Sequence, residues 1–176
     1  MTRRPVLLAL LIGAGLHAGT AAQEVSTEYR VKAAFLYNFV KFVEWPLRVA
    51  TGPITLCVAG RNPFGSVLDD IVRAETVDGR PLESRVILEP DPSCHVVFIP
   101  TGVNTGAYLR ASRGTPTLTV GDGARFIEQG GIVRFYLDNG TVRFAINRDG
   151  AERAGLRISS RLLQLARIEP NPGEAP

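Results

Sequence analysis

Residues 131–146 constrain the fold of this chain more than any other segment. They read GIVRFYLDNGTVRFAI, and Asn139-Gly140 within them is the preferred pair for a two-residue type I′ hairpin turn. With these two residues as the loop, three facing pairs on one face of the ribbon are apolar, namely Leu137 with Val142, Phe135 with Phe144, and Val133 with Ile146. Turn chemistry and side-chain alternation agree on one register, so we expect a β-hairpin here.

The rest of the chain alternates between short apolar runs and helical patterns. We expect strands at residues 54–60, 84–89, 94–100 and 117–122. Helices are expected at residues 27–45, 64–74 and 103–113. Two more are expected from their caps, one that Asp122 caps and that ends at Gln129, and a last one capped by Ser159 or Ser160. Strands that alternate with helices favour parallel pairing. The sequence therefore predicts a single α/β domain, with a mixed and mostly parallel sheet flanked by helices, a C-terminal β-hairpin at residues 131–146, and a final helix.

The helix expected at residues 27–45 is apolar nearly all the way round. The residues expected to face the core, in helical rows, are Val31, Phe35, Phe39, Phe42 and Val43. The other apolar residues are Ala33, Leu36, Tyr37, Val40 and Trp45, and the surface is interrupted only by Arg30, Lys32, Asn38, Lys41 and Glu44. Two interpretations stay open. Either the helix packs between the sheet and the C-terminal helix, or its second apolar side contacts another chain.

Residues 1–22 have the layout of a secretory signal peptide. Arg3 and Arg4 precede an apolar run over residues 6–16, and small residues follow up to Ala22. The apolar run is about half of the roughly 20 residues that a membrane span needs. We therefore expect export, cleavage near Ala22, and a product that is not embedded in the membrane.

Cleavage would leave a nearly neutral chain. The full sequence has 20 Lys and Arg residues against 17 Asp and Glu residues. Because Arg3 and Arg4 leave with the signal and no acid does, 18 basic and 17 acidic side chains remain, which is a formal net charge of +1. No basic run is visible, and this excludes nucleic acid as the partner. Residues 23–168 suit one domain, and the Pro-rich residues 169–176 are expected to be a disordered tail.

Cys57 and Cys94 are the only cysteines in the sequence. In an oxidising compartment a lone pair is most simply a disulfide, and two buried thiols are the alternative. A disulfide closing a loop of this length contributes about 4 kcal/mol in the chain-entropy model. A structural zinc site is disfavoured, because His95 is the only histidine left after cleavage and three ligands fall short of four. We expect neither a metal nor a cofactor.

The sequence offers little catalytic chemistry. It contains no GxSxG, HExxH, Walker loop or GxGxxG after a strand. A serine or cysteine nucleophile needs a general base, and His95 lies in an apolar strand, where a structural role is more common. Gly121-Asp122-Gly123 lacks the spacing of a phosphate loop, and helix capping explains Asp122. We do not expect an enzyme.

Several separated motifs resemble those of one known family. In chain order they are EYRVKAAFLYNFVKFVEWP, ITLCVAGRNPFG, the CHVVFI strand, LTVGD, RFAIN and AGLRISSRLLQLA. Together they resemble the YfiR family over nearly all of the mature chain, which implies a small soluble periplasmic α/β protein without catalysis. Cys57 and Cys94 match the cysteine pair of that family. Some members carry a second disulfide near the hairpin, and this chain has no counterpart to it.

The resemblance implies a regulator of cyclic di-GMP signalling. The best-known members bind the periplasmic sensor domain of an inner-membrane diguanylate cyclase and hold it inactive, and an outer-membrane lipoprotein can sequester the repressor. The residues that we expect to bind a partner, either the cyclase or a second copy in a homodimer, are Phe35, Tyr37, Val40 and Trp45. Tyr37 and Trp45 are expected at the surface, because each carries a polar atom that tolerates water.

A periplasmic small-molecule-binding sensor module is the alternative function. Arg157 and Ser159 precede the last helix, where an anion could meet free backbone N–H groups. The simpler explanation of the same residues is that Ser159 caps the helix and that Arg157 is solvated. The sequence allows both explanations.

Overall fold

A mixed sheet of eight strands forms the centre of the computed structural model, which describes residues 25–46 and 51–170. The strand order is β10-β8-β7-β6-β5-β2-β4-β3. Their bounds are β2 Ile54–Ala59, β3 Thr76–Val77, β4 Arg80–Ile87, β5 Val96–Ile99, β6 Leu118–Gly121, β7 Val133–Asp138, β8 Thr141–Ile146 and β10 Arg167–Ile168. Only the β7/β8 and β3/β4 pairs are antiparallel, and the other neighbours pair in parallel. The prediction of a single α/β domain with a mixed, mostly parallel sheet is confirmed.

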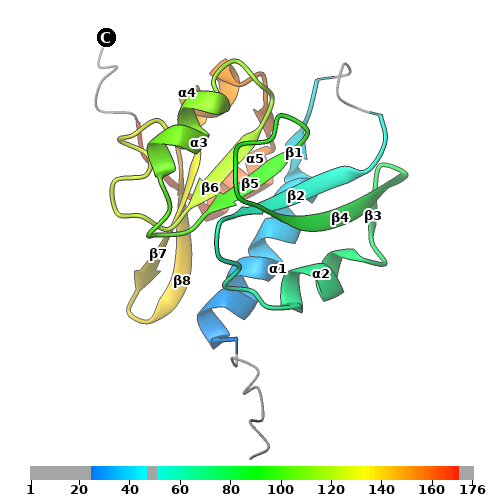
Figure 1. Ribbon diagram of the computed structural model, residues 1–176. Helices are drawn as coiled ribbons and strands as arrows, with labels where there is room; N and C mark the ends of the chain where they lie inside the picture. Colours follow the sequence, from blue (N-terminus) through cyan, green and yellow to red (C-terminus); the bar gives the residue numbers. More distant parts are fainter. Residues whose placement is uncertain (1–24, 47–50, 171–176) are drawn as a thin grey trace, which may run out of the picture.

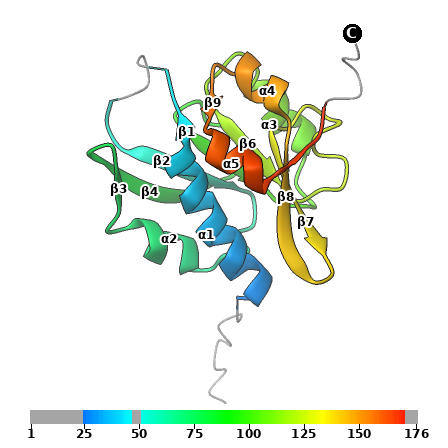
Figure 2. The same ribbon diagram turned by 180° about the vertical axis from the view of Figure 1, so that it is seen from behind.

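Helices cover both faces of this sheet (Figures 1 and 2). The helices α1 (Thr27–Phe42), α2 (Val67–Val72) and α5 (Ser160–Leu165) lie on one face. The helix α3 (Thr105–Ala111) lies on the other face, and α4 (Arg148–Arg153) sits beside it at one end of the sheet. Burial on both faces explains why all six residues of β2 are buried and why the strand reads as an unbroken apolar run.

The hairpin has the predicted register. Leu137 faces Val142, Phe135 faces Phe144 and Val133 faces Ile146, with Asp138 opposite Thr141 next to the turn. Asn139 and Gly140 have φ angles of +48° and +77°, the left-handed values that a type I′ turn requires. Turn chemistry and side-chain alternation within one short segment were therefore enough to define this hairpin.

Replacing Gly140 by Ala is expected to lower the free energy of unfolding by about 1–2 kcal/mol, because an L-residue is strained at its φ of +77°. An added Cβ would have no atom within 4 Å, so the strain comes from the backbone alone. Denaturant unfolding measures the change. The matched control is Gly123→Ala, where an added Cβ meets only Thr101 at 4.0 Å and no loss is expected. Equal losses in the two variants would contradict the turn assignment.

Several element boundaries differ from the prediction. The helix α1 ends at Phe42 and not at residue 45, because the next two residues form strand β1 (Val43–Glu44), which pairs with β9 (Arg157–Ile158). The helices predicted at 64–74 and 103–113 correspond to α2 and α3, and both are shorter than predicted. Strand β4 begins four residues before the predicted strand at 84–89. The short strands β1, β3, β9 and β10 were not predicted, because each depends on a pairing partner and not on a pattern of its own.

The helix predicted after Asp122 is wrong. Residues 124–130 form consecutive turns, and the Asp122 carboxylate accepts hydrogen bonds from Tyr29, Lys32 and the Thr101 backbone N–H and caps no helix.

The predicted signal peptide, residues 1–22, lies outside the described residues, as do residues 171–176 of the predicted tail. Glu169, the first residue of that tail, is held by the sheet. Its backbone N–H donates to the Ile146 carbonyl at 3.0 Å, and its carboxylate lies 2.7 Å from the Arg134 guanidinium.

Candidate functional site

Helix α1 carries most of the residues expected to bind a partner. Its Ser26 N-cap accepts a hydrogen bond from the Tyr29 N–H. The side that packs on the sheet consists of Ala33, Leu36, Phe39 and Val40, each at most 1 % exposed. The predicted core stripe is right in part: Phe39 and Val43 are buried, at 0 % and 6 % exposed. It is wrong for the other three residues, since Val31 is 38 % exposed and Phe35 and Phe42 are only partly buried. The ring of Phe39 lies beneath the helix with these smaller side chains, whereas the rings of Phe35 and Tyr37 lie on its two sides.

Neighbouring elements cover both sides of α1 (Figure 2). On the hairpin side, the ring of Phe35 lies 6.0 Å from that of Phe135 and 5.3 Å from that of Phe144, between centroids. On the α2 side, the Tyr37 hydroxyl donates a hydrogen bond to the Glu75 carboxylate at 2.6 Å. That hydrogen bond, together with burial, raises the pKa of Tyr37. Phe35 and Tyr37 are both half-buried, on opposite sides of the helix.

Val40 and Trp45 are placed differently from what was expected. Val40 is 1 % exposed and belongs to the core, so it presents no surface to a partner. Trp45 follows β1, and its ring packs edge-on against His95 with 6.1 Å between centroids. The indole Nε1 of Trp45 is buried and has no hydrogen-bond partner among the described residues. The expectation that this N–H faces water is therefore wrong, although the side chain as a whole is only partly buried.

The short β1/β9 pair brings Trp45 near the residues of the predicted ligand site. Glu44 is opposite Arg157, and their side chains are 3.9 Å apart and largely exposed. Ser159 caps α5 by accepting the Leu162 N–H at 3.3 Å. The simpler explanation of Ser159 therefore accounts for its geometry, and Arg157 lies at the surface with a side chain that is 86 % exposed.

A buried ionic cluster joins α1 to the carboxyl ends of the central strands. The Lys32 Nζ lies 2.9 Å from an Asp122 oxygen and 2.5 Å from a Glu28 oxygen. The Lys32 side chain is only 4 % exposed and that of Asp122 only 9 %. Lys32 was expected to interrupt the helix surface, and this expectation is wrong. Its ammonium group also lies 4.5 Å from the centre of the Tyr29 ring.

The Asp122 carboxylate of this cluster accepts two further hydrogen bonds. It accepts from the Tyr29 hydroxyl at 3.1 Å and from the Thr101 N–H at 2.9 Å, in the loop after β5. Burial raises the pKa of the Tyr29 hydroxyl, and the negative charge of Asp122 raises it further. Tyr29 therefore stays protonated and keeps donating to Asp122.

Cys57 and Cys94 form a disulfide with 5.8 Å between their Cα atoms. The parallel pairing of β2 with β5 brings them together. Both residues are at most 2 % exposed. The neighbouring His95 is held by the backbone, because the Thr55 N–H donates to its Nδ1 at 3.2 Å.

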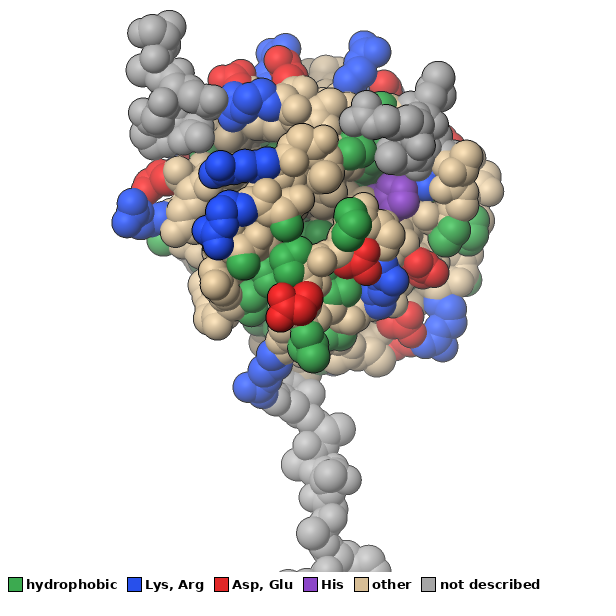
Figure 3. All heavy atoms as spheres, turned by 45° about the horizontal axis from the view of Figure 1, so that its top comes forward, with side chains coloured by type: hydrophobic (Ala, Val, Ile, Leu, Met, Phe, Trp, Pro, Cys, Tyr) green, Lys and Arg blue, Asp and Glu red, His purple; other side chains and the backbone are tan. Residues whose placement is uncertain are grey.

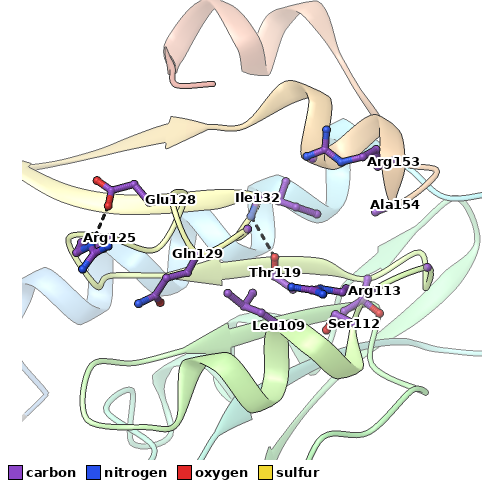
Figure 4. A pocket seen from close by; sticks show the side chains of 14 residues that line it. Leu109, Ser112, Arg113, Thr119, Arg125, Glu128, Gln129, Ile132, Arg153 and Ala154 are labelled. Carbon is purple, nitrogen blue, oxygen red and sulfur yellow. Dashed lines mark hydrogen bonds and ion pairs between the residues drawn. The ribbon is translucent and has the colours of Figure 1, made fainter. Parts of the chain in front are cut away.

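A cavity of about 760 Å³ lies on the opposite face of the sheet from α1, between α3, α4 and the turns after β6 (Figure 4). Its lining includes three arginines, Arg113, Arg125 and Arg153. Sequence reasoning missed this cavity, because the three arginines come from three separate segments and no spacing links them.

The described part of the chain holds no group of three or more His, Cys, Asp or Glu side chains arranged to bind a metal ion. No helix within residues 25–46 and 51–170 is long and apolar enough to cross a membrane. A family model described as YfiR/HmsC-like matches residues 29–167. The chain belongs to this family. The YfiR/HmsC-like match runs from Tyr29 in α1 to Arg167 in β10, so it includes β2 to β8 in full and the first residue of β10.

Membership of the YfiR/HmsC-like family gives the chain a general role. The family is periplasmic, regulatory and non-catalytic, and this supports a periplasmic regulator of cyclic di-GMP signalling. The disulfide fits such a compartment, because the periplasm is oxidising.

Proposed function

We propose that this protein is a non-catalytic periplasmic regulator that binds the periplasmic sensor domain of an inner-membrane diguanylate cyclase and represses cyclic di-GMP synthesis. The observation that carries the proposal is the YfiR/HmsC-like match over residues 29–167. The predicted signal peptide at residues 1–22 would bring the chain to the compartment of that sensor domain. An outer-membrane lipoprotein that sequesters the regulator belongs to the same proposal.

The proposed contact surface is the outer side of α1 with the ends of the elements beside it. Phe35, Tyr37 and Trp45 are half-buried there and keep some accessible ring surface, whereas Val40 is left out because it is buried. Two exposed apolar side chains extend this surface toward the hairpin, namely Val31, which is 38 % exposed, and Leu137, which is 54 % exposed. Partly buried aromatics are the side chains in which binding energy concentrates. The same surface would serve a homodimer.

The paired substitution Tyr37→Ala with Trp45→Ala is expected to weaken binding to the purified periplasmic domain of the cyclase about tenfold or more, since each ring supplies contact area. Calorimetric titration measures the binding, and a thermal melt of the same sample measures folding. Loss of the Tyr37 hydrogen bond to Glu75 should lower stability by only about 1 kcal/mol.

The matched control is Leu88→Ala, which truncates an apolar side chain that is 80 % exposed after β4. It should bind the cyclase domain like the parent protein. Unchanged binding by the paired variant would contradict the proposed surface. Absence of binding by the parent protein itself would contradict the proposed function, and sedimentation of the free protein would report a homodimer through the same surface.

A further inference from the structure

We propose that the cavity between α3 and α4 binds a small organic anion that carries a phosphate or a pair of carboxylates on a short apolar body. Its volume of about 760 Å³ lies within the 300–1,000 Å³ typical of small-molecule sites. It lies on the face of the sheet opposite α1, so this inference stands independently of the proposed contact with the cyclase.

The rim of the cavity is cationic. Arg113 reaches it from the segment after α3, Arg153 from α4, and Arg125 from the turns after β6 (Figure 4). Glu128 is the only acid in the lining, and its carboxylate lies 2.8 Å from Arg125. Three guanidinium groups and one carboxylate leave a net charge of +2 around the opening. Figure 3 shows basic side chains close together on the side of the molecule that carries α3 and α4.

Arg113 is available to a ligand. Its guanidinium contacts no acceptor within the described part of the chain, whereas Arg125 is paired with Glu128. A guanidinium presents its donors in a rigid fork that matches carboxylate and phosphate oxygens. The rim therefore suits an anion with at least two oxygens in one plane.

The floor of the cavity supplies a buried donor. Thr119 is 2 % exposed, and its hydroxyl oxygen accepts the Ile132 N–H at 3.1 Å. A hydroxyl can accept and donate at the same time, and the hydrogen of this hydroxyl has no acceptor among residues 25–46 and 51–170. Buried polar groups are normally hydrogen-bonded. An oxygen of a bound ligand would be an acceptor for this hydroxyl.

Apolar side chains complete the floor. Leu109 from α3 is 6 % exposed and Ile132 before β7 is 4 % exposed, and Ala154 after α4 also lines the cavity. A fully hydrated inorganic ion gains nothing from these side chains, whereas a ligand with a short apolar body buries them. This combination distinguishes an organic anion from inorganic phosphate.

The test is calorimetric titration of the full disulfide-bonded protein with phenyl phosphate at low ionic strength. We expect saturable binding with one site per chain. Inorganic phosphate and phenol should bind more weakly, because the first lacks the apolar body and the second lacks the phosphate. Arg113→Ala and Arg153→Ala should each weaken the binding of phenyl phosphate about tenfold or more, the loss expected for one charge-assisted hydrogen bond. Arg113→Gln keeps a polar side chain and removes the charge, and it repeats the test if the alanine variant folds poorly.

The matched control is Arg161→Ala on α5, which removes the same charge from the other face of the sheet. It should bind phenyl phosphate like the parent protein. The inference is overturned if phenyl phosphate does not bind, if it binds no better than inorganic phosphate, or if Arg161→Ala weakens binding as much as Arg113→Ala. Loss of cyclase binding alone would leave this result unchanged, so the two proposals fail separately.

Discussion

Replacing Lys32 by Met is expected to lower the free energy of unfolding by about 3–5 kcal/mol, a large fraction of the roughly 5–15 kcal/mol that holds a domain together. The substitution keeps most of the length of the side chain and removes the charge. It leaves the Asp122 carboxylate, only 9 % exposed, without the ammonium that lies 2.9 Å away. Denaturant unfolding followed by circular dichroism measures the loss.

The cluster also predicts how the substitutions combine. Asp122→Asn keeps an acceptor for the Thr101 N–H and removes the charge, so it should also be strongly destabilising. The double variant should lose less stability than the sum of the two single variants. Each single variant leaves one buried charge without its partner, whereas the double variant removes both charges.

The matched control is Arg73→Met, which breaks an ion pair with Asp69 whose side chains are 69 % and 45 % exposed. It should cost no more than about 1 kcal/mol, because solvent screens an exposed pair. A loss of the same size for Lys32→Met would show that the buried pair contributes little. Additive losses in the double variant would show that the two residues do not interact.

The parts of the fold that could be predicted are those that depend on local chemistry. Asn139-Gly140 defined the hairpin because the turn type and the facing apolar pairs lie within one short segment. The β2 and β5 strands were recognised because burial on both faces makes each an unbroken apolar run. The start of α1 at Thr27 agrees with the prediction, because the Ser26 N-cap contact that fixes it spans only three residues.

The parts that were missed depend on contacts between distant segments. The end of α1 is decided by the pairing of Glu44 with Arg157, far along the chain. In the sequence Lys32 looks like an ordinary surface lysine, because its partner Asp122, at the end of β6, is distant along the chain. An aspartate after a strand suits a helix cap equally well, so its sequence position alone led to the wrong helix.

The candidate site also has features that local sequence predicts and features that depend on distant contacts. The sequence indicated that α1 holds more apolar surface than one stripe can bury, and the structure accounts for most of it with the sheet, the hairpin and α2. Half-buried Phe35, Tyr37 and Trp45 could be named from their residue types, whereas the burial of Val40 could not, because it depends on which side the helix turns to the sheet. The cationic cavity had no sequence signal, since its arginines meet only in the folded chain.

Removing the disulfide is expected to lower the free energy of unfolding by about 4 kcal/mol, because the cross-link joins residues 37 positions apart and restricts the unfolded chain. For a domain of this size the melting temperature should fall by roughly 8–16 °C. The variant is Cys57→Ala with Cys94→Ala, measured by thermal and denaturant unfolding. The denaturant m-value should rise, since an unfolded chain without the cross-link exposes more surface.

Reductant separates the effect of the bond from that of the two substitutions. Both cysteines are at most 2 % exposed, so reduction of the parent protein should be slow in the folded state and fast once denaturant opens the chain. After complete reduction, the parent protein should melt near the temperature of the double variant. The double variant itself should not respond to reductant. If the parent protein keeps its melting temperature after complete reduction, the bond between β2 and β5 contributes nothing to stability, and the chain-entropy argument does not apply to this fold.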